Sequence, residues 1–179
     1  MADQHSDEEL IALARNGDRS AFKRLVERYE VKVAGIIKPM LGDVPQAADV
    51  GQEVFIRFYE SLGKFKGESS LGTYLVRIAI NLSLNEIKRM KRREKIFRPL
   101  EVGHHVKDDE SSRDRYEMVH HEINKLDPDF RIVVTLRMIE GYSTEETSKI
   151  LKIPLGTVLS RLARAQKKLR DVLHKQGEQ

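Results

Sequence analysis

Apolar residues recur every three or four positions along most of this chain, which is the spacing of residues on one face of an α-helix. In the first half this pattern predicts four helices: one from about Ser6 to Gly17, one over 22–40, one from about Gln46 to Leu62, and one that begins at Leu71. No segment shows the sustained alternation of a half-buried strand. We therefore expect an all-α fold.

The segment from Pro99 to Arg115 interrupts the helical pattern. It contains proline, glycine, two serines and the acidic run 108–110, with little apolar periodicity. Such a composition is typical of a flexible linker. We therefore predict two small helical domains, residues 1–98 and 116–179, joined by a linker over residues 99–115.

The second domain is expected to open with two helices. Apolar spacing predicts the first from about Tyr116 to Leu126. Asp127 and Pro128 suit the cap and the first turn of the second, which runs to about Ile139.

The segment 142–170 predicts two further helices separated by a short break. Ser143 and Glu146 form a capping box that can start the first, and Ile-Pro-Leu-Gly at 153–156 breaks the pattern. In the second helix four apolar residues are expected to face inward: Val158, Leu162, Ala165 and Leu169. Polar residues on its other faces are candidates for contacting DNA: Thr157, Ser160, Arg161, Arg164, Lys167 and Lys168. This is the arrangement of a helix-turn-helix.

An alternative interpretation of the same stretch is an amphipathic terminal helix with a solvated basic face. For an isolated basic helix that interpretation would be preferred. The capped helix before it, the break between them, and the absence of any acidic residue over 157–170 favour DNA binding instead.

The distribution of charge supports contact with a polyanion. The 179-residue chain has a net charge of +4, with 40% hydrophobic and 34% charged residues, as in an ordinary soluble protein. Seven basic residues and one acidic residue lie between Lys88 and Arg98, and five basic residues with no acidic one lie over 157–170. Two basic segments on an otherwise acidic chain suggest two contacts along one nucleic acid.

Several functional classes are disfavoured. The chain has no cysteine, which excludes a disulfide framework, a thiolate metal site and a cysteine nucleophile. The N-terminus is acidic and no apolar run reaches the length of a membrane span, so we expect a cytoplasmic protein without membrane insertion.

We also expect no cofactor, no metal ion and no enzymatic activity. The chain has neither a phosphate-binding loop nor a G-x-G-x-x-G motif. The adjacent histidines at 104–105 and at 120–121 diverge on a helix, and Glu117 with His121 has helical spacing but no evident third ligand.

The whole chain resembles the extracytoplasmic-function (group 4) sigma factors of bacterial RNA polymerase, in the sigma-70 family. The resemblance rests on an ordered set of motifs: Asn16–Phe22, Gln52–Phe55, Phe65–Ser70, Thr73–Asn81, Tyr142–Leu151, Ile153–Val158 and Ser160–Leu162. It implies a region 2 helical bundle and a region 4 helix-turn-helix.

In this family, one helix of the first domain docks on a coiled coil of the polymerase clamp. The resemblance assigns that role to Asp49, Gln52, Glu53 and Phe55. A polar surface beside an aromatic anchor suits such an interface. The alternative is a solvated helix face with Phe55 in the core.

The resemblance also implies that the loop over 65–70 and the helix after it read the minus-ten element. In the family, this part of the protein captures an unstacked base and holds the separated strand. The candidate residues are Lys64, Phe65, Lys66, Ser69, Tyr74, Arg77, Asn81, Lys88 and Arg92. Small residues in a loop can close around a base, and cations can follow the strand. The alternative is that Phe65 and Tyr74 are core aromatics and that the basic cluster beginning at Lys88 is a solvated helix end.

For the second domain, the resemblance implies that the last helix reads the minus-thirty-five element. Ser160, Arg161 and Arg164 would face bases or phosphates, and Lys167 or Lys168 would hold the backbone. The chain departs from the family at Gln46–Asp49, where only the last carboxylate is kept, at Tyr74 in place of a tryptophan, and at Leu159 and Ala163.

We therefore expect a sigma factor that binds core RNA polymerase and promoter DNA and helps to melt the promoter. It is expected to be a monomer when free and to be inhibited by an anti-sigma factor. The alternative is a stand-alone helix-turn-helix regulator whose N-terminal half serves dimerisation or effector binding.

Overall fold

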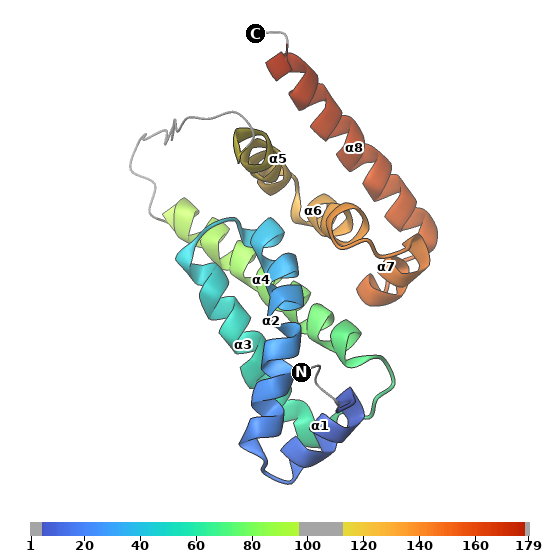
Figure 1. Ribbon diagram of the computed structural model, residues 1–179. Helices are drawn as coiled ribbons and strands as arrows, with labels where there is room; N and C mark the ends of the chain where they lie inside the picture. The colour runs from blue at the N-terminus through green and yellow to red at the C-terminus, as the bar shows by residue number, and fades with distance from the viewer. Residues whose placement is uncertain (1–4, 97–112, 178–179) are drawn as a thin grey trace.

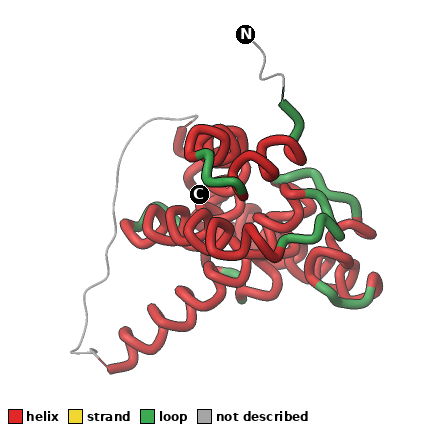
Figure 2. The backbone as a smooth tube through the Cα atoms, turned by 90° about the horizontal axis from the view of Figure 1, so that it is seen from below, coloured by secondary structure: helices red, strands yellow, loops and turns green. Residues whose placement is uncertain are grey.

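The computed structural model describes residues 5–96 and 113–177, most of which are helical (Figure 1). No strand occurs in these two ranges (Figure 2), which confirms the all-α prediction. The predicted linker lies outside the described residues up to 112. Helix α5 begins at Arg113.

The N-terminal unit contains α1 (Asp7–Arg15), α2 (Arg19–Leu41), α3 (Pro45–Ser61), a 3-10 turn η1 (Leu62–Lys64) and α4 (Leu71–Ile96). The residues predicted to begin and end these helices lie at the observed helix ends. Ser6 and Glu9 form both bonds of a capping box at the start of α1. Helix α2 ends at Gly42, whose φ of +82° favours glycine.

Helix α2 lies at the centre of this unit, with α1, α3 and α4 packed around it (Figure 1). The largest fully buried side chains include Leu10, Leu25, Ile36, Met40, Phe58 and Leu75, one or more from each helix. Burying each of them contributes about 1.5–3 kcal/mol, so this packing supplies most of the stability of the unit.

The C-terminal unit contains α5 (Arg113–Lys125), α6 (Pro128–Val134), a π-turn η2 (Thr135–Ile139), α7 (Thr144–Leu151) and α8 (Leu155–Gly177). A single helix was predicted up to Ile139, but it widens into the π-turn at Thr135. The Thr135 hydroxyl donates to the carbonyl of Arg131 (3.0 Å), and the Glu140 amide donates to the carbonyl of Thr135 (2.9 Å). A hydroxyl that competes for a helical carbonyl accounts for the distortion.

The two units are packed against each other. Ile132, Val133 and Leu136 belong to the same buried cluster as the core of the N-terminal unit. The Nζ atom of Lys32 in α2 lies 5.2 Å from the centre of the Tyr142 ring, and Arg77 in α4 donates to the carbonyl of Lys149 (3.0 Å). One buried cluster therefore extends across both units, and a second, smaller cluster of Ile123, Leu126, Val134 and Ala165 lies within the C-terminal unit.

Helix α2 approaches the C-terminal unit closely at Gly35. A Cβ atom at this position would overlap the carboxylate of Glu140. This explains a glycine in the interior of a long helix, where it weakens helix formation. Burial raises the pKa of Glu140, and the charge of nearby Lys32 opposes the rise.

The Arg131 guanidinium is buried at this interface and donates to backbone carbonyls at the ends of two helices. It donates to Met40 at the end of α2, to Asn124 in the last turn of α5, and to Leu126 (3.0 Å). Burial lowers the pKa of Arg131, and the charge of Asp127 works in the opposite direction. Arg131 thus satisfies carbonyls that a helix end leaves without partners.

We expect Arg131→Met to lower the free energy of unfolding by about 2–4 kcal/mol, because buried carbonyls lose a charged donor. Urea denaturation followed by circular dichroism measures this. The control is Arg57→Met, which removes an exposed partner of Glu53 (2.8 Å) and should change the free energy by less than about 0.5 kcal/mol. Equal losses in the two variants would contradict the role given to Arg131.

Candidate nucleic-acid interface

Helices α7 and α8 form the predicted helix-turn-helix. The break between them is built on Lys152, which has a φ of +55°, and on the Ser148 hydroxyl, which donates to the carbonyl of Ile153 (2.6 Å). Val158 and Ala165 of α8 are fully buried, and Leu162 and Leu169 are half-buried against the core. The predicted inward face of α8 is therefore confirmed.

The start of α7 is fixed by the predicted capping box. The Ser143 amide donates to the Glu146 carboxylate (2.7 Å), and the Glu146 amide donates to the Ser143 hydroxyl (3.1 Å). Hydrogen bonds from the backbone and side chain of Ser143 lower the pKa of Glu146. Arg137 of η2 donates to the carbonyl of Tyr142 and so holds the preceding loop.

The predicted DNA-contacting residues of α8 fall into two groups. Ser160, Arg164 and Lys167 are exposed, as the departing residue Leu159 is. The half-buried Arg161 pairs with Asp129 (2.6 Å). Lys168 lies near Asp127 (3.7 Å) and over the Phe130 ring. The sixth candidate, Thr157, is half-buried. Two of the six candidates are therefore held against the start of α6.

The two aspartates were missed as partners of α8. Asp127 is the N-cap residue of α6, as predicted, but its side chain makes no capping bond and lies near Lys168. The spacing of these residues could have indicated the contacts. Arg161 and Lys168 are seven residues apart and lie on the same face of the helix, and two carboxylates flank Pro128.

A cavity of about 620 Å³ lies between α4 and the C-terminal unit. Lys88 of α4 lines it together with residues of α6 and with four of the α8 candidates: Thr157, Ser160, Arg161 and Arg164. A predicted minus-ten residue thus faces the predicted minus-thirty-five residues across one cavity.

The loop after α3 is held by aromatic packing. The Phe65 ring lies 4.9 Å from the Tyr74 ring and 6.3 Å from the Phe58 ring, between ring centres, and the Tyr74 hydroxyl donates to Ser61 (2.9 Å). Phe65 and Tyr74 are half-buried and pack against the core. Arg15, which sequence reasoning missed, donates to the carbonyl of Phe65 and fixes the loop.

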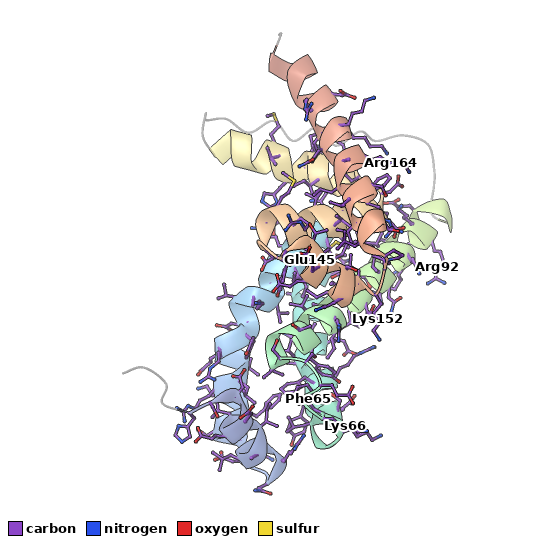
Figure 3. All side chains as sticks on the ribbon, turned by 90° about the vertical axis from the view of Figure 1, so that its right-hand side faces the viewer. Phe65, Lys66, Arg92, Glu145, Lys152 and Arg164 are labelled. Carbon is purple, nitrogen blue, oxygen red and sulfur yellow. The ribbon has the colours of Figure 1, made fainter. Side chains whose placement is uncertain are left out.

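The other minus-ten candidates are spread along the loop and α4. Lys64, Lys66, Asn81, Lys88 and Arg92 are exposed, Ser69 is half-buried, and Arg77 is directed toward α7 by its bond to Lys149. Figure 3 shows Lys66 and Arg92 on the same side of the molecule as Lys152 and Arg164. One side of the closed molecule therefore carries cations from both units.

A separate apolar groove of about 400 Å³ lies between α2 and α3. Gln52 and Phe55 line it, together with Val26, Val33 and Ile37 of α2. Of the other two polymerase-binding candidates, Glu53 pairs with Arg57 (2.8 Å) and Asp49 is exposed. Phe55 packs against the core and also lines the groove.

The residues that the structure describes offer neither a metal site nor a membrane span. They contain no group of three histidine, aspartate or glutamate side chains placed to hold a metal ion. None of the helices in the described ranges is long and apolar enough to cross a membrane.

Two family models match the chain: sigma-70 region 2 over residues 25–93 and sigma-70 region 4 over residues 116–169. The chain is 37% identical to the RNA polymerase sigma-H factor of Pseudomonas aeruginosa, covering 97% of this chain and 96% of that protein. It is 36% identical to the ECF RNA polymerase sigma-E factor of Haemophilus influenzae, covering 96% of this chain and 97% of that protein.

Solved structures show the same fold. CnrH in complex with the cytosolic domain of CnrY has a TM-score of 0.69 at 27% identity, covering 94% of this chain and 97% of that chain. The sigma factor RpoE in complex with the anti-sigma factor NepR, from Bartonella quintana, has a TM-score of 0.68 at 20% identity. The match covers 86% of this chain and 96% of that chain.

We expect Ser143→Ala to lower the free energy of unfolding at neutral pH by about 1 kcal/mol, because α7 loses a cap. The difference from the unchanged protein should shrink in acid. A carboxylate with a lowered pKa contributes stability above its unfolded pKa and loses it as pH falls through the folded value. Denaturation at a series of pH values measures both effects.

The matched control is Ser6→Ala, which removes the equivalent bond at the start of α1. Both variants should lose stability, but only Ser143→Ala should weaken DNA binding, because α7 packs against α8 whereas α1 packs against α2 and η1. Equal DNA binding by the two variants would contradict the role given to α7.

Proposed function

Because the chain belongs to the extracytoplasmic-function sigma factors of the sigma-70 family and directs promoter-specific transcription initiation, we propose a role for each of its surfaces. The N-terminal unit docks on core polymerase and holds the melted minus-ten element, and α8 reads the minus-thirty-five element. The observation that carries this proposal is the exposed polar face of α8, with Ser160, Arg164 and Lys167 placed by a capped α7. An exposed, cationic second helix is what a helix-turn-helix presents to the major groove.

We propose that the groove between α2 and α3 receives the polymerase clamp. Gln52 supplies an exposed amide at its edge, and Phe55 supplies apolar surface inside it. A polar rim around an apolar centre is the usual composition of a protein interface. Asp49 and Glu53 extend the polar rim along α3.

We propose that the loop over 64–69 and the adjacent face of α4 hold the non-paired strand. Lys64, Lys66 and Arg92 are exposed and can follow phosphates, while the half-buried rings of Phe65 and Tyr74 are candidates to stack on a base. Stacking on a half-buried ring requires little rearrangement, because Ser61 and Arg15 already fix the loop.

The closed arrangement cannot engage both promoter elements. Lys88 and Arg161 line one cavity, whereas the two elements occupy separate stretches of DNA. We therefore propose that the two units separate when the factor joins polymerase. The cationic residues of the cavity then become accessible to the duplex.

The proposed role is non-catalytic, since polymerase carries out the chemistry, and it places the protein in the cytoplasm. A similar fold binds the anti-sigma factor NepR, which supports control of this chain by an anti-sigma factor. We favour a monomer in the free state, because the two proposed DNA-contacting surfaces differ from each other. A stand-alone regulator would bind a symmetric site as a dimer.

Multi-round transcription from a genomic promoter library, with purified core polymerase, tests this function. We expect the protein to add start sites that share two spaced upstream motifs. Arg164→Glu should abolish these starts while polymerase is still bound, because Arg164 is exposed and its reversal repels phosphates. Gln52→Arg should instead weaken polymerase binding, by about tenfold or more.

Two variants serve as controls. Arg19→Glu makes the same charge change as Arg164→Glu at the first position of α2, and Glu60→Arg replaces an exposed residue of α3 that does not line the groove. Neither should alter the start sites. A protein that adds no start sites to active polymerase, yet protects a palindromic site alone, would be a regulator and not a sigma factor.

A further inference from the structure

Arg161, a candidate reader of the minus-thirty-five element, is held by a carboxylate from another helix. Its Nη2 atom lies 2.6 Å from Oδ2 of Asp129, in the first turn of α6. The Asp129 side chain is 64% exposed, and that of Arg161 is 26% exposed. This contact joins α6 to α8 through two residues that are 32 positions apart in the sequence.

Stability is a weak explanation for this ion pair. A pair with one member so exposed contributes little to folding, because water screens it and both side chains lose freedom. The charge of Asp129 has one other favourable effect, which is its position in the first turn of α6, and this too is worth little at an exposed site. A role in orienting Arg161 explains the geometry better.

The pair leaves Arg161 able to bind a base. A guanidinium carries five N–H donors in a fixed plane, and Asp129 engages only one nitrogen, Nη2. Fixing that plane beforehand removes rotamer freedom that Arg161 would otherwise lose on binding DNA. Two N–H groups held in a plane suit the paired acceptors of guanine.

The carboxylate also weakens contact with phosphates. A free arginine on a recognition helix can swing to the nearest phosphate, which carries no sequence information. Asp129 competes for Arg161 and adds a negative charge near the DNA, so it disfavours non-specific binding. Asp129 therefore favours base discrimination over affinity.

We propose that Asp129 is a positioning residue that sets base specificity at the minus-thirty-five element through Arg161. The proposal rests on the role given to α8 above. Asp129, in the first turn of α6, would thus affect DNA recognition without touching the DNA.

The test uses polymerase holoenzyme and a promoter library randomised over the upstream element, with sequencing of the templates that are transcribed. We expect Asp129→Asn to flatten the base preference at one or two adjacent positions, by about tenfold, and to keep it elsewhere. Binding to unrelated DNA should become tighter. A residue with only a structural role would not shift the profile at particular positions.

The matched control is Asp127→Asn, which removes the same charge two residues away but lies near Lys168 and not Arg161. Its base-preference profile should match that of the unchanged protein. Thermal unfolding of both variants checks that the exposed substitutions leave the fold intact.

Three results would overturn the proposal. An unchanged profile in Asp129→Asn would show that Arg161 needs no positioning. Equal tightening on all sequences would show that Asp129 only repels phosphates. A flat profile in the unchanged protein would contradict the role of α8 itself, and so would reject the proposed function together with this inference.

Discussion

The hydrogen bonds of the Arg131 guanidinium are the interaction on which the arrangement of the two helical units depends. Arg131 donates to Met40 at the end of α2 and to Asn124 and Leu126 around the end of α5. A bond to a charged donor contributes about 1.5–3 kcal/mol, and its loss leaves buried carbonyls without partners. Since α2 is also the centre of the N-terminal core, the bond from Arg131 to Met40 ties the C-terminal unit to that core.

This closed packing has a direct consequence for DNA contact. It places Lys88 of α4 opposite Arg161 and Arg164 of α8, across a single cavity. The same helix α6 that carries Arg131 also carries Asp129, which holds Arg161. Helix α6 therefore carries both the residue that joins the two units and the carboxylate that holds Arg161, which we propose to contact DNA.

Local signals predicted most of the fold, and long-range contacts account for what was missed. The capping boxes at Ser6 and Ser143 were predicted because all their atoms lie within three residues. Asp127 is the predicted N-cap residue of α6, but the ion pair of its side chain could not be predicted because Lys168 is distant in the chain. The π-turn at Thr135 was missed because periodicity carries no signal for a hydroxyl that competes with a helical bond. The site residues follow from pattern and resemblance, whereas their partners require the packed structure.

The central claim is that the free protein is closed through Arg131 and opens on binding polymerase. Because the native chain has no cysteine, Lys23→Cys with Glu145→Cys places one spin label on each unit, and pulsed electron paramagnetic resonance measures their separation. The account predicts one narrow distance in the free protein, a broad distribution when Arg131→Met is added, and a longer distance in active holoenzyme. A broad distribution in the free protein, or the same distance in holoenzyme that initiates transcription, would contradict it.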